Sequence, residues 1–184
     1  LTTAKRIARD AGKILMEIYA TDFDVAYKGK ANPVTEADTL ANAFIVGELR
    51  KAFPADGIVA EESADRSDAT GVGRCWYVDP LDGTKEFIAK NGEFAVMLGL
   101  TVDGESRLGV VFQPAKDKLY AGVVGEGATL EEGGKERALS VTDTAEPKDL
   151  RLVVSRSHRA DSIDRVVREL GITDEKKSGS VGLK

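Results

Sequence analysis

Four acidic residues stand directly after two short apolar runs of the chain. They are Glu61 and Glu62 after residues 57–60, and Asp79 and Asp82 after residues 75–78. If the two runs are neighbouring strands, the loops at their ends bring these carboxylates together. Like charges repel strongly at close range where the effective dielectric is low, so such a cluster implies a bound cation. Carboxylate oxygens are hard ligands that select Mg²⁺ or Ca²⁺ over zinc.

The segment from Asp79 to Asp82 is suited to present several oxygen ligands at one point. Pro80 fixes its own φ and lacks an N–H, so we expect the strand to end there. The turn that follows would bring Asp79 and Asp82 to one side and aim the carbonyl oxygen of Leu81 at the same point. Taken alone, each of these acids would be interpreted as a helix cap or a solvated surface group. The whole segment, together with the upstream Glu-Glu pair, favours a metal site.

A short helix is expected to begin at Thr84, immediately after Gly83. Gly83 allows the backbone to approach a ligand closely because it has no side chain. The first N–H groups of a helix have no acceptor within the helix and attract anions. A metal site beside such a helix start is suited to a phosphate group.

The periodicity of apolar residues predicts the elements that would position this site. Helices are expected over 3–20, 35–53 and 160–170, and strands over 57–60, 75–78, 94–102, 107–113, 119–124 and 150–154. Residues 128–141 are interpreted as an excursion that turns at Gly133-Gly134. Two helices followed by many neighbouring strands indicate an α+β fold, with layers built on a largely antiparallel sheet.

The composition excludes several classes of protein. The chain has 184 residues with 26 Lys and Arg against 31 Asp and Glu, which gives a net charge of −5. This acidity argues against binding of a nucleic acid polymer through bulk charge. One Cys and one His exclude a zinc cluster built from these residue types, and the single Cys fits a reducing, cytoplasmic compartment. No apolar run is long enough to span a bilayer as a helix.

The motifs resemble those of the inositol-monophosphatase-like phosphatases, which are Mg²⁺-dependent and lithium-sensitive. The resemblance rests on Pro-Val-Thr-x-x-Asp at 33–38, Glu-Glu-Ser at 61–63 and Asp-Pro-Leu-Asp-Gly-Thr at 79–84. Three further segments are similar to the 3′(2′),5′-bisphosphate nucleotidase branch: Lys-Glu-Phe at 85–87, Asn-Gly-Glu-Phe at 91–94 and Ser-Arg-Ser-His at 155–158. Inositol monophosphatases usually carry Thr-Asn-Phe in place of the first of these.

The resemblance implies a role for each matched residue. Glu61, Asp79, Asp82 and the Leu81 carbonyl would ligate Mg²⁺, Asp38 and Thr84 would orient and deprotonate the attacking water, and Glu62 would stand beside the metal as a further catalytic residue. The substrate would contact Glu61, Leu81, Asp82, Gly83, Thr84, Lys85, Ser155, His158 and Lys184. Asp38 also has a purely structural interpretation, because Thr35-x-x-Asp38 forms a capping box at a helix start.

The activity that the resemblance implies is hydrolysis of the 3′-phosphate of adenosine 3′,5′-bisphosphate to AMP and phosphate. Two or three Mg²⁺ ions would assist in the complete protein, with inhibition by Li⁺. An inositol-1-monophosphatase or another sugar phosphatase shares this metal chemistry, so a phosphorylated polyol is the alternative substrate. A homodimer is compatible with the resemblance, and peripheral association with a membrane stays open.

The fold that the resemblance implies is a layered α/β sandwich of the inositol monophosphatase and sugar phosphatase type. Residues 1–184 would form a single phosphatase domain. The chain begins at Leu1 rather than Met, and it lacks the family's downstream Trp-Asp element, because Trp76 is the single Trp and belongs to the first motif. We therefore expect the N-terminal larger portion of the domain, without its C-terminal portion. A catalytically incomplete fragment that binds metal or phosphate is the alternative.

Overall fold

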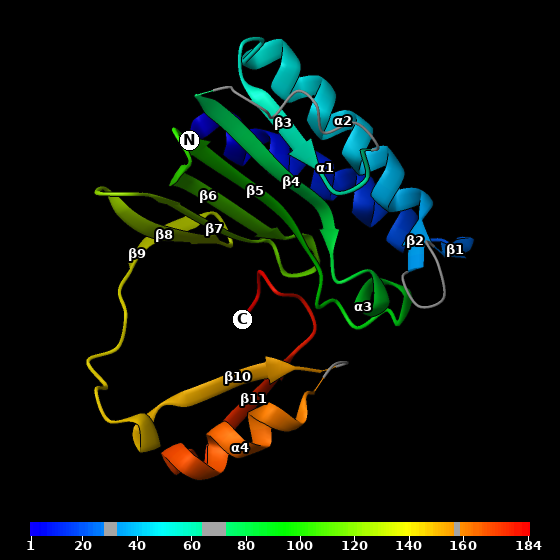
Figure 1. Cartoon of the computed structure of the whole chain (residues 1–184). Helices are drawn as coiled ribbons and strands as arrows, with labels where there is room; N and C mark the ends of the chain where they lie inside the picture. The colour runs from blue at the N-terminus through cyan, green and yellow to red at the C-terminus, as the bar shows by residue number, and fades with distance from the viewer. Residues whose placement is uncertain (28–32, 64–72, 157–158) are drawn as a thin grey trace.

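Within the described residues, a seven-stranded sheet with two long helices on one face forms the sheet body, and a smaller unit lies beyond its other face (Figure 1). The computed structural model describes residues 1–27, 33–63, 73–156 and 159–184. The sheet contains β3 (Gly57–Ala60), β4 (Arg74–Asp82), β5 (Ala95–Val102), β6 (Glu105–Gln113), β7 (Lys118–Val123), β8 (Gly127–Glu132) and β9 (Lys135–Leu139), in that order. β3 and β4 are parallel, and every other neighbouring pair in this sheet is antiparallel. The predicted α+β fold with a largely antiparallel sheet is confirmed.

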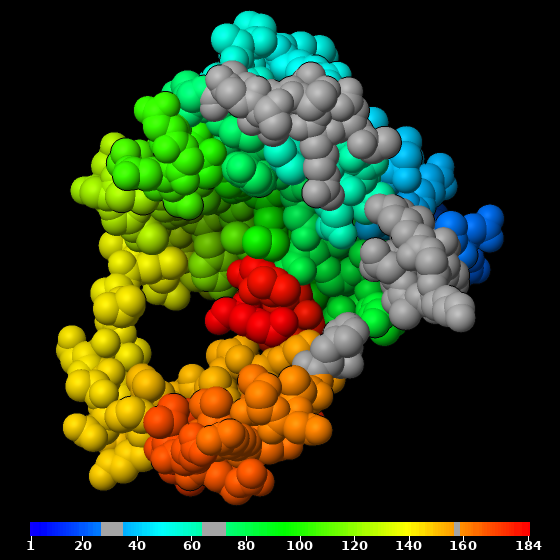
Figure 2. Space-filling model, in the orientation of Figure 1, coloured from blue at the N-terminus to red at the C-terminus, as the bar shows by residue number. Residues whose placement is uncertain are grey.

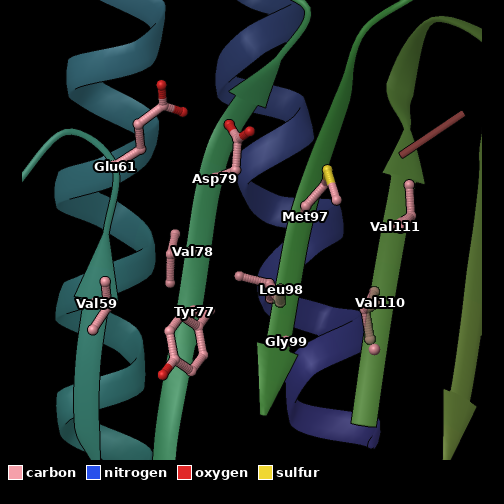
Figure 3. Close-up of a pocket in the computed structure, with 11 residues that line it drawn as sticks. Val59, Glu61, Tyr77, Val78, Asp79, Met97, Leu98, Gly99, Val110 and Val111 are labelled. Carbon is pink, nitrogen blue, oxygen red and sulfur yellow. The ribbon is translucent and has the colours of Figure 1, made fainter. Parts of the chain in front are cut away.

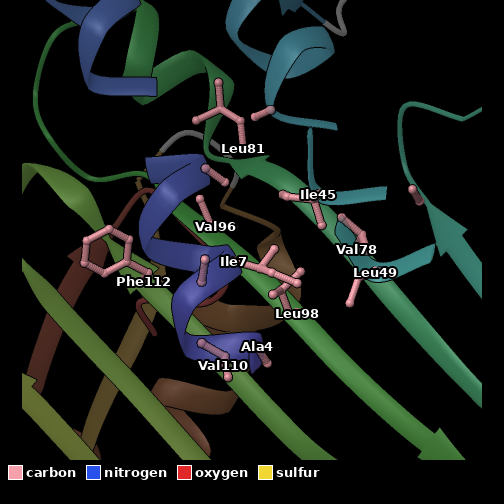
Figure 4. Packing of buried hydrophobic residues seen from close by; sticks show 14 of the residues in the cluster. Ala4, Ile7, Ile45, Leu49, Val78, Leu81, Val96, Leu98, Val110 and Phe112 are labelled. Atoms are coloured by element: carbon pink, nitrogen blue, oxygen red, sulfur yellow. The ribbon is translucent and has the colours of Figure 1, made fainter. Parts of the chain in front are cut away.

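The two long helices bury one apolar face each against the sheet. α1 (Thr2–Tyr19) and α2 (Glu36–Ala52) agree with the two predicted ranges to within a residue or so. Their inward positions recur at helical spacing and are almost fully buried: Ala4, Ile7, Ala8, Ala11, Leu15, Ala37, Ala41, Ile45 and Leu49. These side chains share one core cluster with Val78, Val96, Leu98 and Val110 of the strands (Figure 4). The long helices thus cover one face of the sheet, and functional side chains can stand on the other.

Strand β4 differs from the sequence-based expectation in a way that matters for the site. Pro80 does not end the strand, because β4 continues to Asp82. Asp79 pairs with Met97 and Asp82 pairs with Ala95, so the register shifts between the two acids. Side chains alternate between faces along a regular strand, and residues three apart would therefore point to opposite faces. The bulge restores Asp79 and Asp82 to one face, because their partners stand two apart on β5.

Shorter elements complete the sheet body. β1 (Val25–Tyr27) and β2 (Pro33–Thr35) pair antiparallel ahead of α2, and α3 (Thr84–Ile88) follows β4 where a helix was expected. The predicted excursion over 128–141 is the hairpin of β8 and β9. Single 3-10 turns lie at Pro114–Lys116 and Pro147–Asp149. No helix in the described ranges is both long enough and apolar enough to cross a membrane.

The C-terminal unit consists of β10 (Arg151–Ser155), α4 (Asp161–Leu170) and β11 (Asp174–Ser178). β10 and β11 pair in parallel, with α4 as the crossover between them. α4 ends at Gly171, whose left-handed φ of 66° closes the helix. β11 is absent from the predicted strands, because Asp-Glu-Lys-Lys-Ser contains no apolar residue to mark a strand. After β11 the chain returns to the sheet body and ends between the two parts (Figure 2).

Candidate active site

The carboxyl ends of β3 and β4 bring the first predicted acids together. The two strands are parallel neighbours with Ala60 beside Val78, and the Glu61 N–H donates to the Val78 carbonyl over 3.0 Å. Glu61 and Asp79 therefore stand side by side at this edge of the sheet (Figure 3). The two apolar runs are neighbouring strands, as the clustering of these carboxylates requires.

A hollow of about 460 Å³ lies over strands β3 to β6 (Figure 3). Its lining is largely apolar, with Met97 and Val111 among the residues that form it, and Glu61 and Asp79 line one end. Tyr77, which also lines the hollow, is 49% exposed. A molecule bound here would meet carboxylates at one end and an apolar surface over the rest.

Asp79 has a strongly perturbed carboxyl group. Burial, reinforced by the nearby charges of Glu61 and Asp82, raises its pKa from 3.8 to about 8. The Leu81 N–H lies 3.1 Å from Asp79 Oδ1, and its hydrogen bond acts in the opposite direction but is outweighed. The ionised carboxylates repel one another at this end of the sheet, and a divalent cation would relieve that repulsion.

The donor set fits a hard divalent cation, although its side chains are not closed around one point. Three carboxylates and a main-chain carbonyl are oxygen ligands of the kind that Mg²⁺ takes. Along the part of the chain that the structure describes, no three His, Cys, Asp or Glu side chains are grouped as ligands of one ion. Asp82 instead uses its Oδ2 to accept hydrogen bonds from the Ser180 hydroxyl and from the Gly182 N–H, the latter at 2.7 Å.

Asp38 makes the contact expected of a helix-capping residue and also a contact with Thr84, so both interpretations of the sequence pattern apply to it. Its Oδ2 accepts hydrogen bonds from the N–H and from the hydroxyl of Thr35, each at 2.7 Å, as a helix-capping residue does. Its Oδ1 accepts from the Thr84 hydroxyl at 3.1 Å. Burial raises the pKa of Asp38, the charge of Glu62 adds to this, and the bonds from Thr35 and Thr84 oppose it. A buried carboxylate that holds a hydroxyl in this way can take up a proton through it.

Gly83 has a backbone conformation and a neighbour that exclude a side chain. Its φ is 98°, and a Cβ atom there would lie 2.9 Å from the Glu93 carbonyl oxygen. Gly83 is also the N-cap of α3, so the first N–H groups of that helix follow it directly. The Thr84 hydroxyl lies 3.3 Å from the Leu81 carbonyl oxygen, which keeps the predicted phosphate-binding turn beside a predicted metal ligand.

The remaining predicted residues occupy other positions. Lys85 is exposed on α3, Ser155 is the last residue of β10, and the exposed Lys184 donates its N–H to the Val181 carbonyl. His158 lies outside the described residues. The structure therefore places Glu61, Asp79, Leu81, Asp82, Gly83, Thr84 and Asp38 around the ends of β3 and β4, with Glu62 acting on Asp38 by its charge.

Two residues of the site, Ser180 and Gly182, are not among the predicted ones. They contact Asp82 from 98 and 100 positions away. The signal available in the sequence is the run of small residues at 179–182, which permits close approach to another part of the chain. Such a run does not indicate which part of the chain it approaches.

Comparison with known proteins shows the family of the chain. A model of the inositol monophosphatase family matches residues 1–178. The chain is 37% identical over 180 residues to the 3′(2′),5′-bisphosphate nucleotidase CysQ of Escherichia coli O157:H7, covering 96% of this chain and 70% of that protein. It is 36% identical over 132 residues to the Nus factor SuhB of Salmonella typhimurium strain 14028s, covering 71% and 49%. The solved structure of extragenic suppressor protein suhB from Bartonella henselae aligns with a TM-score of 0.85 and 27% identity, over 99% of this chain and 71% of that chain. The chain belongs to the inositol monophosphatase family.

Proposed function

We propose that the protein is a Mg²⁺-dependent phosphomonoesterase that removes the 3′-phosphate of adenosine 3′,5′-bisphosphate, giving AMP and phosphate. The observation that carries the proposal is that Glu61 and Asp79 lie at the ends of β3 and β4, while the Thr84 hydroxyl, which donates to Asp38, lies 3.3 Å from the Leu81 carbonyl oxygen. Membership of the inositol monophosphatase family supports a phosphatase. Residues 1–184 would act as one phosphatase domain.

Glu61, Asp79, Asp82 and the Leu81 carbonyl would hold the metal. They are oxygen ligands next to the turn that would bind phosphate, and their mutual repulsion favours a cation. A bound Mg²⁺ ion neutralises phosphate oxygens and lowers the pKa of a bound water.

The protein's own groups would orient the attacking water and remove its proton. The Thr84 hydroxyl donates to Asp38, so the lone pairs of its oxygen are available to a water molecule. As Thr84 accepts a proton from that water, its own proton can pass to Asp38, whose raised pKa suits it to accept one. The main-chain N–H groups of Gly83 and Thr84 would hold the phosphate oxygens. Glu62 would stand beside the metal and sustain the raised pKa of Asp38.

Two groups of relatives support two classes of substrate. CysQ, named as a bisphosphate nucleotidase, matches 96% of the chain, whereas SuhB matches 71% at similar identity. The longer match supports the nucleotide, with Lys85, Ser155, His158 and Lys184 as the residues that would bind its remaining part. A polyol phosphate is the second candidate, because the fold also aligns with an inositol monophosphatase of Thermotoga maritima at a TM-score of 0.82.

Phosphate release from adenosine 3′,5′-bisphosphate and from inositol 1-phosphate, each with Mg²⁺ and with EDTA, tests the proposal. We expect release only with Mg²⁺, inhibition by Li⁺, and a kcat/KM for the nucleotide at least about tenfold higher, or about 1.4 kcal/mol. An Asp79→Asn variant purified identically controls for contaminating phosphatases. A preference for the inositol ester would overturn the proposed substrate, and phosphate release in EDTA would overturn the proposed metal dependence. No release from either ester would favour the catalytically incomplete fragment.

A further inference from the structure

One carboxylate joins the sheet body to the C-terminal unit. Glu93, in the loop between α3 and β5, accepts two hydrogen bonds from the Arg156 guanidinium: Nε lies 3.0 Å from Oε2, and Nη2 lies 2.5 Å from Oε1. Glu93 Oε2 also accepts from the Gly179 N–H at 2.9 Å. Arg156 follows β10 and Gly179 follows β11, so this carboxylate holds the ends of both parallel strands. The Arg156 N–H ties the two ends to each other by donating to the Ser178 carbonyl at 3.0 Å.

The contacts of Glu93 with Arg156 and Gly179 are called here the joint. The residues after β11 continue from this joint to the candidate metal site. Residues 179–182, called here the strap, lie between the sheet body and the C-terminal unit (Figure 2). Ser180 is fully buried, and its hydroxyl and the Gly182 N–H both donate to Oδ2 of Asp82. Hydrogen bonds and adjacent residues therefore connect Arg156 to Asp82 through Glu93 and the strap without a gap.

Two glycines show how closely the strap is fitted. A Cβ atom on Gly179 would overlap the side chain of Glu86, and one on Gly182 would lie 2.8 Å from Met97 Sδ and 3.1 Å from Val111 Cγ1. The separations from Glu86 and Met97 are shorter than real Cβ contacts, and the one from Val111 is tighter than most, so the strap packs closely against these side chains. The position of the strap then depends on the hydrogen bonds that Glu93 makes at its start.

We propose that Glu93 and Arg156 are positioning residues for Asp82: their ion pair seats the strap, and the strap fixes one oxygen of Asp82 so that the carboxylate is oriented for a divalent cation. This inference rests on the proposed function, since it gives Asp82 a metal-binding role. Partners that hydrogen-bond a metal ligand orient it and tune the affinity for the metal. Here that partner is the strap, and the residues that place the strap lie on both sides of it.

One residue from each of the three sequence segments that resemble the bisphosphate nucleotidase branch lies at this joint. Glu93 comes from 91–94 and Arg156 from 155–158. Glu86, from 85–87, is buried beneath Gly179. The pKa of Arg156 is raised by its hydrogen bond to Glu93 and, to a smaller degree, by the charge of Glu86. Their convergence gives these three segments one shared physical task.

The exposure of the ion pair indicates that it serves position more than stability. The Arg156 and Glu93 side chains are 44% and 24% exposed, and ion pairs at such exposure contribute little to the free energy of unfolding. A two-bond contact between a guanidinium and a carboxylate nevertheless fixes the relative orientation of both groups. Arg159 offers a matched comparison, because it pairs with Asp164 at 2.6 Å and Glu175 at 2.7 Å, both inside the C-terminal unit.

Direct binding of Mn²⁺, followed by the electron paramagnetic resonance signal of the free ion, tests the role without requiring turnover. Glu93→Ala and Arg156→Ala should each weaken binding by about tenfold, the lower end of the effect of losing a partner of a metal ligand. The double variant should bind about as weakly as either single one, because both residues act through one connection. Glu93→Gln, which keeps an acceptor for the Gly179 N–H, should lose less, and Arg159→Ala should bind as the parent does.

Amide hydrogen exchange in the metal-free protein provides the second measurement. We expect faster exchange at Ser180 and Gly182 in Glu93→Ala and Arg156→Ala, and unchanged exchange in Arg159→Ala. Unchanged Mn²⁺ affinity in both alanine variants would overturn the inference, as would an equal loss in Arg159→Ala. If the parent protein bound no Mn²⁺, the proposed metal dependence would fail and so would the assigned role of Asp82. In that case the exchange rates would still show separately whether the joint seats the strap.

Discussion

The Thr84 hydroxyl donates a hydrogen bond to Asp38 Oδ1 over 3.1 Å, across 46 positions of the chain. Asp38 lies in the first turn of α2 and Thr84 opens α3, so the bond joins the starts of two helices. The same hydroxyl lies close to the Leu81 carbonyl at the end of β4. Helix starts and strand ends thus contribute separate parts of one site, and each part can be removed on its own.

Replacing Thr84 by Ala removes the group that connects a water molecule to Asp38. We expect kcat to fall by about 10²–10⁴, the range for loss of a general acid–base contribution. Thr84→Ser keeps the hydroxyl and should retain kcat to within about tenfold of the parent value. Steady-state kinetics on both variants, with urea unfolding as the check on folding, measure the effect. Equal losses in the Ala and Ser variants would contradict the assigned role.

The two contacts of Asp38 can be separated by two variants. Thr35→Ala removes the hydroxyl bond at the helix start, so the free energy of unfolding should fall by about 1 kcal/mol while kcat is largely kept. Asp38→Asn keeps an acceptor for the Thr35 N–H but cannot take up a proton, so kcat should fall by about 10²–10⁴. If Thr35→Ala lowered kcat as much as Asp38→Asn does, Asp38 would act through the cap alone.

Asp79→Asn should separate metal binding from stability. The raised pKa of Asp79 means that the folded, metal-free protein holds a proton there between about pH 4 and pH 8, whereas the unfolded chain does not. Stability from this group therefore falls as the pH rises through that window. With EDTA present, the free energy of unfolding of Asp79→Asn relative to that of the parent should rise by at least about 1 kcal/mol from pH 5 to pH 9. The affinity of the variant for Mn²⁺ should fall at least about tenfold. A variant that is no more stable at pH 9 would contradict the repulsion described above.

The order of the helices and strands follows from the sequence because each buried face repeats along its own element. The apolar positions of α1 and α2 recur at helical spacing, and their predicted ranges agree with the structure. β11 does not follow from such a pattern, because four of its five residues are exposed and Ser178 alone is buried. Its pairing with β10 depends on main-chain hydrogen bonds, which leave no trace in residue type.

The site follows from the sequence where its residues are neighbours in the chain. Asp79 to Thr84 form one segment, and Glu61 joins them through a single pairing of parallel strands. The shared face of Asp79 and Asp82 was expected from a turn at Pro80 but comes from a bulge within β4. The bond from Ser180 to Asp82 spans 98 positions and involves a small residue without periodic context, so nothing in the local pattern predicts it.

Glu131 should contribute a pH-dependent link between α1 and β8. Its carboxylate contacts Lys5 Nζ at 2.6 Å and Arg9 Nη2 at 2.7 Å, and these bonds lower its pKa from 4.5 to about 2. The stabilisation is therefore complete above pH 4.5 and is lost as the pH falls toward 2. Glu131→Gln should lower the free energy of unfolding by about 1 kcal/mol at pH 7, since solvent screens the pair, and by almost nothing near pH 2. Glu132→Gln, which removes the ion pair with Lys118 at 3.0 Å, is the matched control and should lower the free energy of unfolding by less.

Gly83→Ala should affect both folding and catalysis, and a second glycine separates the two causes. Gly83 and Gly104 both have a left-handed φ, 98° and 81°, so Ala at either position pays a conformational cost of about 1 kcal/mol. A Cβ at position 83 would also press on the Glu93 carbonyl 2.9 Å away, whereas one at position 104 would meet nothing within 4 Å. Gly104→Ala should therefore lower the free energy of unfolding and leave kcat/KM unchanged. Gly83→Ala should lose more stability and at least about tenfold in kcat/KM, because the start of α3 must shift away from its place beside the acidic residues. The kinetics are measured at a temperature where both variants are folded. Equal kcat/KM for the two would show that catalysis does not depend on the close approach of Gly83 to the Glu93 carbonyl.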